Sequence, residues 1–158
     1  MEQYFHFQSP LGWLKITTQP KALSAIEFVK APAAIELAQD ELQTSVENQL
    51  SQYFEGDRTA FSLPLSLAGT SFQKKIWELL LKIPWGKTVS YMDLAKQYGD
   101  VKAIRAVGMA NNKNPLPIVV PCHRVIGSDG SLVGYASGLN TKEWLLRHEG
   151  VITQLAIF

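Results

Sequence analysis

The sequence contains a single cysteine, Cys122, among its 158 residues. One cysteine cannot form an internal disulfide or supply the ligands of a structural zinc site, so we expect a free thiol and no metal. No apolar run approaches the roughly 18 residues that a membrane-spanning helix needs. The chain also begins without the basic start and apolar core of a signal peptide. These absences predict a cytoplasmic protein that has no membrane association and no cofactor.

Charge is distributed unevenly along a chain whose formal net charge is only +1. Residues 1–69 carry four basic and eight acidic side chains, a net charge of −4, whereas residues 70–158 carry eleven basic and six acidic ones, a net charge of +5. A basic second half suits a polyanionic partner, although a solvated charged surface would have the same composition. Hydrophobic residues make up 46% of the chain, enough for one core or two small ones.

The first 68 residues have the pattern of a small sheet followed by a helix. Apolar alternation and turn residues predict three strands, around 4–8, 14–18 and 23–29. From about Pro32, apolar residues recur at helical spacing and predict a helix that ends at Gly56. This stripe consists of Ile35, Ala38, Leu42, Val46, Leu50 and Tyr53/Phe54. No catalytic grouping is present, and the histidine in this part, His6, is interpreted as a packing residue.

Helix caps and helix breakers divide the second half. They predict four helices: one between Thr70 and Pro84, one from Ser90 to Gly99, one over about 102–110, and one capped by Asn140–Glu143 that runs to His148. The second and third are short and joined by a glycine-containing turn, which is a helix-turn-helix pattern. A hairpin-type turn is expected at Gly127–Gly130.

Cys122 lies at the end of a stiff segment, Asn114–Val125, which contains three prolines. Proline fixes φ and biases the residue before it towards extended geometry, so this segment cannot be helical. The apolar run Ile118–Val120 is typical of buried chain. A thiol on a rigid, partly buried arm is a candidate nucleophile, and the adjacent His123 is a candidate base. Adjacency alone does not establish the pair, because neighbouring side chains often point apart.

The predicted helix at 102–110 surrounds one arginine, Arg105, with small residues such as Ala106 and Gly108. A helix of this kind can approach a partner closely, and an arginine that projects from it could enter a DNA groove or replace a displaced base. The small residues would equally permit close packing between helices, which leaves Arg105 as a surface cation.

The pentapeptide Pro121-Cys122-His123-Arg124-Val125 resembles the signature of the O6-alkylguanine-DNA alkyltransferases, also called methylated-DNA–protein-cysteine methyltransferases. Further blocks over about residues 69–150 resemble this family in order and spacing: 69–73, 83–86, 89–91, 105–108, 114–115, 134–135, 143–146 and 149–150. The resemblance implies an α/β (α+β) fold. It places a small ribonuclease-H-like sheet-plus-helix support domain at 1–68, and a winged helix-turn-helix-like domain for DNA binding and alkyl transfer at 69–158.

The resemblance also implies the chemistry, which is DNA repair by direct transfer of a methyl or larger alkyl group from O6 of guanine to Cys122. His123 matches a histidine that relays the thiol proton through a water, Glu149 matches the glutamate that orients it, and Asn114 matches an asparagine that braces the segment. A thioether carbon has no easy hydrolytic route, so each molecule would act once. Without the resemblance, Glu149 would be an exposed charge at a helix end. Adduct size and activity on O4-alkylthymine stay open.

The expected partner is double-stranded DNA that contains O6-alkylguanine, bound by a monomer through the minor groove with the damaged nucleotide rotated out of the stack. Arg105 matches the arginine that fills the vacated stack, and Tyr91 matches the tyrosine that helps to flip the nucleotide. The implied DNA-binding residues are Arg105, Tyr91, Ala106 and Gly108, and the implied base pocket is Tyr91, Val125, Tyr135, Ala136 and Ser137. Without the resemblance, both tyrosines would be ordinary amphipathic aromatics.

Two other functions would use the same helix-turn-helix. A non-catalytic lesion sensor, like the alkyltransferase-like proteins, would replace the cysteine, usually with tryptophan, so the presence of Cys122 argues against it. A DNA-binding regulator would leave the segment around Cys122 and His123 unexplained.

Overall fold

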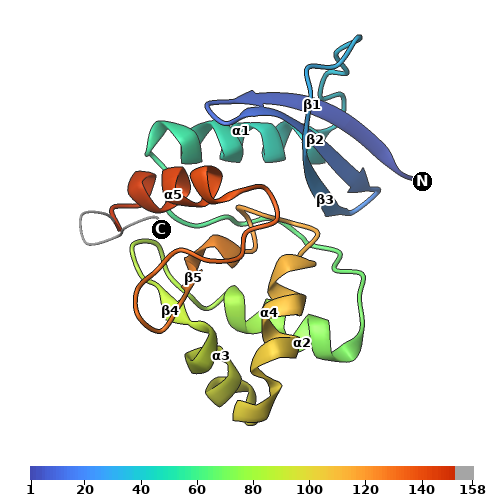
Figure 1. The fold of residues 1–158 in the computed structure, drawn as a ribbon. Coiled ribbons are helices and arrows are strands. Elements are labelled where there is room, and N and C mark those ends of the chain that lie inside the picture. Colours follow the sequence, from blue (N-terminus) through green and yellow to red (C-terminus); the bar gives the residue numbers. More distant parts are fainter. Residues whose placement is uncertain (152–158) are drawn as a thin grey trace. The chain divides into compact units, whose positions relative to one another are not determined.

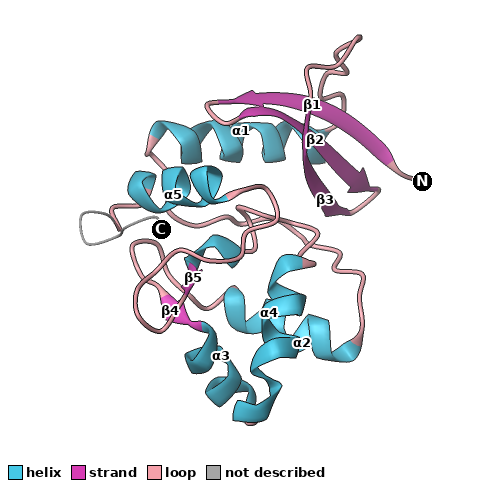
Figure 2. Cartoon of the chain, in the orientation of Figure 1, coloured by secondary structure: helices cyan, strands magenta, loops and turns pink. Residues whose placement is uncertain are grey.

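The computed structural model describes residues 1–151, which form two compact units (Figure 1). One unit is Met1–Ala68 and the other begins at Gly69. The first combines a sheet with a helix and the second is mainly helical (Figure 2), so the expected mixed α/β fold is confirmed. Within residues 1–151, no helix is both long and apolar enough to cross a membrane.

The sheet of the first unit is an antiparallel meander of three strands, β1 (Gln3–Ser9), β2 (Gly12–Gln19) and β3 (Ala22–Val29). All three predicted strands are confirmed. Phe5 pairs with Ile16, which pairs with Ile26, so these side chains share one face of the sheet. All three are buried, and they form the core with the apolar face of the helix that follows.

That helix, α1 (Glu41–Glu55), begins later than the apolar stripe predicts, so the expected start near Pro32 is wrong. Asp40 is the N-cap, and its side chain accepts a hydrogen bond from the Gln43 backbone at 2.8 Å. Upstream, Glu36 uses its backbone groups on β1: its carbonyl accepts from the His6 amide at 2.8 Å, and its amide donates to His6 Nδ1 at 2.9 Å. Those backbone groups are therefore not available to a helix. Gly56, with φ of 85°, ends α1.

The second unit is built on α2 (Ser71–Leu80), α3 (Tyr91–Tyr98) and α4 (Ile104–Asn112), the last preceded by a short 3₁₀ turn, Val101–Ala103. Capping boxes at Thr70 and at Ser90 begin α2 and α3, as predicted. Gly99, with φ of 106°, makes the turn between α3 and α4, and the helix-turn-helix is confirmed. The three helices enclose a core of Ile76, Trp77, Leu80, Leu94, Val107 and Ala110.

The remaining elements were only partly predicted. Two short strands, β4 (Val89–Ser90) and β5 (Val125–Ile126), pair in parallel, although no strand was expected here. The Gly127–Gly130 turn forms, but it does not join two antiparallel strands. Helix α5 (Leu139–His148) begins after Gly138 without a side-chain cap, one residue before the expected capping motif. Pairing of β4 with β5 brings the segment after Cys122 next to the start of α3.

Candidate active site

Cys122 begins a short 3₁₀ helix, η2 (Cys122–Arg124), and its side chain is almost completely buried. The Asn114 side chain hydrogen-bonds to the backbone of the segment that leads to Cys122 at two points. Its Nδ2 donates to the Val120 carbonyl at 2.7 Å, and its Oδ1 accepts from the Leu116 amide at 2.9 Å. The Val120 amide also donates to the Leu116 carbonyl at 2.8 Å. The arm that carries the thiol is therefore a closed, hydrogen-bonded turn.

This turn contains a strained residue. Ile118 has φ of 77°, in the left-handed region that a β-branched side chain rarely adopts. Such a conformation costs on the order of 1–3 kcal/mol and persists only when the surroundings fix it. The Ile118 side chain is fully buried, and the turn around it is closed by the Asn114 hydrogen bonds. The position of the Cys122 backbone is therefore fixed by packing on both sides of the strained residue.

His123 and Arg124 converge on one buried carboxylate, that of Glu149, which follows α5. His123 Nε2 lies 2.8 Å from Glu149 Oε2, and Arg124 donates from Nε to Oε1 at 2.7 Å and from Nη2 to Oε2 at 2.9 Å. Arg124 Nη1 also donates to the Ile83 carbonyl at 2.6 Å. Glu149 is not an exposed charge at a helix end, because only 1% of its surface is accessible. His123 and Arg124 thus belong to one buried network that is centred on the Glu149 carboxylate.

The protonation states in this network follow from its geometry. Burial raises the pKa of Glu149, but the hydrogen bonds from His123 and Arg124, together with the positive charge of Arg124, outweigh it and lower the pKa to about 2. Burial lowers the pKa of His123 despite the opposing effect of Glu149. An ionised carboxylate can only accept, so His123 Nε2 donates to it, and Nδ1 is the basic nitrogen. Within residues 1–151, this Nδ1 is buried and has no hydrogen-bond partner.

The thiol itself is held neutral. Burial raises the pKa of Cys122 to about 11, against the hydrogen bond of Asn114 and the positive charge of Lys142. Lys142 is fully buried, and burial lowers its pKa to about 8, against the attraction of Cys122. At neutral pH the site therefore contains a thiol, a neutral imidazole and a mostly protonated lysine. The imidazole can serve as the base for the Cys122 proton, and the lysine can stabilise the thiolate that forms.

Lys142 and Tyr91 also tie the loop before α5 to the site. Lys142 Nζ donates to the Val125 carbonyl and, at 2.9 Å, to the Val133 carbonyl. The Tyr91 hydroxyl lies 3.0 Å from the Val133 carbonyl and 3.2 Å from that of Gly134. Burial and the charge of Cys122 raise the pKa of Tyr91 to about 12, against a hydrogen bond from Asn111, so the tyrosine stays a donor.

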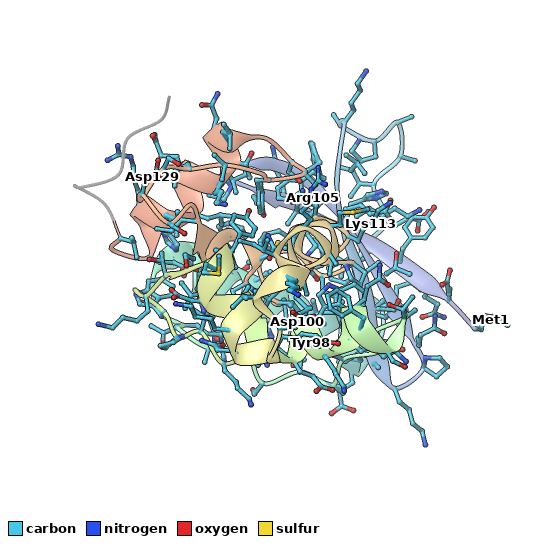
Figure 3. The ribbon with its side chains drawn as sticks, turned by 60° about the horizontal axis from the view of Figure 1, so that its bottom comes forward. Met1, Tyr98, Asp100, Arg105, Lys113 and Asp129 are labelled. Carbon is cyan, nitrogen blue, oxygen red and sulfur yellow. The ribbon has the colours of Figure 1, made fainter. Side chains whose placement is uncertain are left out.

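An open cavity of about 420 Å³ lies where α3, α4 and this loop meet. It is lined by Tyr91, Ile104, Arg105, Gly108, Asn112, Val133 and Gly134. Figure 3 shows Arg105 on α4 and Asp100 in the turn before it. The structure thus brings three of the predicted DNA or base contacts, Tyr91, Arg105 and Gly108, to one cavity. Ala106 is exposed on the same helix and does not line it.

The other predicted pocket residues lie around the same loop. Val125 is buried on β5, Ala136 is exposed and Ser137 is partly buried. The Tyr135 hydroxyl is buried, has no hydrogen-bond partner within residues 1–151, and has a pKa raised by burial. The Tyr135 hydroxyl therefore stays protonated and can donate a hydrogen bond to a ligand.

Three polar residues of the site were not singled out from the sequence: Asn111, Arg124 and Lys142. Arg124 lies inside the pentapeptide Pro121–Val125, and Lys142 could have been found from its helical spacing to buried residues of α5. Lys142, Leu145, Leu146 and Glu149 recur at i, i+3, i+4 and i+7, which places two charged residues on the buried face of α5 and its C-terminal end. Within residues 1–151, the site included, no group of three histidine, cysteine or acidic side chains could hold a metal.

The depressed pKa of Glu149 predicts a loss of stability in acid. Its pKa is about 2 in the fold against an ordinary value of 4.5, so its contribution is complete above about pH 4.5 and is lost as pH falls through about 2. The contribution is at most about 3 kcal/mol. Urea unfolding of wild type and of Glu149→Gln between about pH 5.5 and pH 2.5 measures it. We expect a steeper fall for wild type, and parallel curves would contradict the assignment.

Comparison with known proteins places this geometry in a family. A profile described as "6-O-methylguanine DNA methyltransferase, DNA binding domain" matches residues 71–151, and one described as "6-O-methylguanine DNA methyltransferase, ribonuclease-like domain" matches residues 3–67. The methylated-DNA–protein-cysteine methyltransferase of Methanosarcina acetivorans is 44% identical over 93% of this chain and 97% of its own length. The constitutive enzyme of that name from Bacillus subtilis is 40% identical over 96% of this chain and 97% of its own.

Solved structures agree. The crystal structure of Mycobacterium tuberculosis OGT in complex with DNA superposes with a TM-score of 0.83 at 38% identity, covering 96% of this chain and 95% of that one. The family profiles together span both units, and the relatives match over nearly their whole length. The chain therefore belongs to the 6-O-methylguanine DNA methyltransferase family.

Proposed function

We propose that this protein repairs DNA by transferring an alkyl group from O6 of guanine to Sγ of Cys122. The observation that carries the proposal is the buried arrangement of Cys122, His123 and Glu149. A thiol with a pKa of about 11 needs a base, and His123 is neutral, oriented by an ionised carboxylate, and has Nδ1 unoccupied within residues 1–151. Cys122 is then the nucleophile, His123 the base, and Glu149 the carboxylate that orients the base.

The Cys122 thiol gives its proton to His123 Nδ1, directly or through one water, and the sulfur forms a bond to the alkyl carbon. The bond from that carbon to O6 breaks, and its electron pair stays on the guanine. Glu149 stabilises the imidazolium that forms on His123, and Lys142 stabilises the developing thiolate.

Departure of guanine is assisted by donors on the loop before α5. Negative charge that develops on O6 is matched by the Tyr135 hydroxyl, which is buried and has no partner among residues 1–151, and by the backbone around Ala136 and Ser137. The product is an S-alkyl thioether, whose sp³ carbon water does not readily attack. Each molecule is therefore consumed by one lesion, and the reaction is stoichiometric.

DNA binding is assigned to the helix-turn-helix of the second unit. Arg105 projects from α4 beside the cavity and is suited to fill the gap left by an extruded nucleotide, while Tyr91 lines the cavity that would receive it. Small residues, Ala106 and Gly108, allow α4 to approach a minor groove closely. We assign the first unit, 1–68, a supporting role, and the protein acts as a monomer.

The test of this function is transfer from a duplex that carries one O6-methylguanine with a labelled methyl group. We expect label to move to the protein and unmodified guanine to appear in the DNA in equal amounts. A lesion sensor or a regulator would bind the duplex and leave the label in place. Absence of transfer to the protein would overturn the proposal.

Arg105→Ala is expected to slow repair of duplex DNA by about tenfold or more, since extrusion then leaves an unfilled gap in the stack. Attack on a free alkylated guanine base, which needs no extrusion, is expected to change less than about twofold. Single-turnover rates on both substrates, with exposed Lys113→Ala as a charge-matched control, make the comparison. Equal losses on both substrates would show that Arg105 acts in the pocket or the fold instead.

A further inference from the structure

An aromatic cluster joins the loop between α2 and β4 to the last turn of α5. It consists of Trp85 in the loop and of Trp144 and His148 on the helix. The Trp144 ring stacks on the His148 ring, with the centroids 4.9 Å and the planes 18° apart. The Trp85 ring meets His148 in a T-shaped arrangement, with the centroids 5.5 Å apart. Both arrangements are favoured between aromatic rings, so the cluster fixes the end of α5 against the loop.

The same loop reaches both residues of the buried ion pair, Arg124 and Glu149. The Ile83 carbonyl accepts a hydrogen bond from Arg124 Nη1 at 2.6 Å. Gly86 has φ of 81°, a turn conformation that favours glycine, and a Cβ placed on it would lie 3.5 Å from the Glu149 carbonyl oxygen. The loop backbone therefore binds one residue of the ion pair and passes directly beside the other, with Trp85 between these two points in the sequence.

The direction of the Glu149 side chain depends on the last turn of α5. Glu149 is the C-cap of this helix and directly follows His148. Helix ends fray, because their last carbonyls lack partners within the helix. Consecutive residues are rotated by roughly 100° about a helix axis, so a ring held at His148 also fixes where the next side chain points. To orient the base, that side chain must keep its carboxylate oxygen at hydrogen-bond distance from His123 Nε2, which it does at 2.8 Å.

We propose that Trp85 is a positioning residue for the alkyl transfer. Its ring holds the aromatic cluster, and with it the last turn of α5, so that the Glu149 carboxylate stays aligned with His123. The inference rests on the proposed function, because the reaction that it affects is the transfer to Cys122. In this role Trp85 needs no contact with the DNA or with the alkyl group, since it acts through Glu149 alone.

The test is a double-mutant cycle of Trp85→Ala and Glu149→Gln, measured as single-turnover transfer from a saturating duplex that carries O6-methylguanine. We expect Trp85→Ala to slow transfer about tenfold in the wild-type background, because the base is then poorly oriented. In the Glu149→Gln background it is expected to change the rate less than about twofold, because the carboxylate that Trp85 positions is gone. Equal losses in both backgrounds would overturn the inference, as would an unchanged rate in Trp85→Ala.

The pH dependence of transfer gives a second readout, which a purely structural role would not move. Burial lowers the pKa of His123, and Glu149 opposes that effect. A misaligned carboxylate opposes it less, so the pKa of His123 falls further and the acid limb of the rate profile is expected to shift to lower pH in Trp85→Ala. A lowered rate with the acid limb at its wild-type position would contradict the inference.

Three further variants serve as controls. Trp85→Phe keeps an aromatic ring beside His148 and is expected to retain at least about half of the rate. Trp85→Leu repeats the cycle if the alanine variant does not fold. Trp13→Ala removes a partly buried tryptophan from β2 in the first unit and is expected to keep the rate within about twofold. Absence of transfer by wild type would instead overturn the proposed function, and this inference with it.

Discussion

Cys122→Ser is expected to lower methyl transfer by at least about 10⁴-fold, as removal of the nucleophile from a triad-like site does. A serine hydroxyl is a much weaker nucleophile than a thiolate at neutral pH, and His123 would have to remove a far less acidic proton. The variant should still bind duplex DNA, because Cys122 is buried in η2 and the cavity is lined by other residues. Single-turnover transfer and DNA affinity, measured on the same preparation, test both statements.

The control for this prediction is a measurement of the stability of the Cys122→Ser variant. The Cys122 side chain is nearly buried, and serine differs from it by one atom, so the unfolding midpoint is expected to change little. Transfer that survives in Cys122→Ser would mean that another group accepts the alkyl group, and the assignment of the nucleophile would be wrong.

Glu149→Gln is expected to slow transfer by about 10²-fold or more and to destabilise the protein by about 3–5 kcal/mol. Glutamine has nearly the shape of glutamate but no charge. It leaves the guanidinium of Arg124 buried without its counter-ion, and it cannot stabilise an imidazolium on His123. Urea unfolding gives the stability, and single-turnover transfer well below the unfolding midpoint gives the rate.

The two roles of Glu149 can be separated through Arg124. Arg124→Leu combined with Glu149→Leu removes both buried charges, and we expect it to recover part of the stability that Glu149→Gln loses. The rate should stay low in the double variant, because His123 still lacks its carboxylate. A normal rate in either variant would show that Glu149 is only a structural partner of Arg124.

Local signals in the sequence predicted most of the fold. The strands of the first unit followed from alternation, and α2 and α3 followed from capping boxes whose side-chain and backbone partners lie within four residues of each other. Such interactions involve residues close together in the chain, so they can be predicted from a single sequence. The family motif also predicted Cys122, His123 and Glu149 as site residues, and the structure pairs His123 of η2 with Glu149 at the end of α5.

What the sequence did not predict depends on contacts between distant residues. The stripe before α1 continues at helical spacing, yet the backbone of Glu36 is hydrogen-bonded to His6 on β1 instead. Pairing of β4 with β5 involves only two residues of each strand, too few for a pattern. The left-handed Ile118 contradicts local preference and is held by its buried surroundings. The importance of Lys142 appears only once its carbonyl partners are known.

The central claim is that one alkyl group moves irreversibly to the sulfur of Cys122. Its most direct test is mass spectrometry of the intact protein, and of its peptides, after incubation with excess duplex that carries a deuterated O6-methylguanine. We predict one deuterated methyl group per chain, located on the peptide that contains Cys122 and stable on further incubation. Methyl on another residue, or repair of several lesions by one protein molecule, would contradict the account.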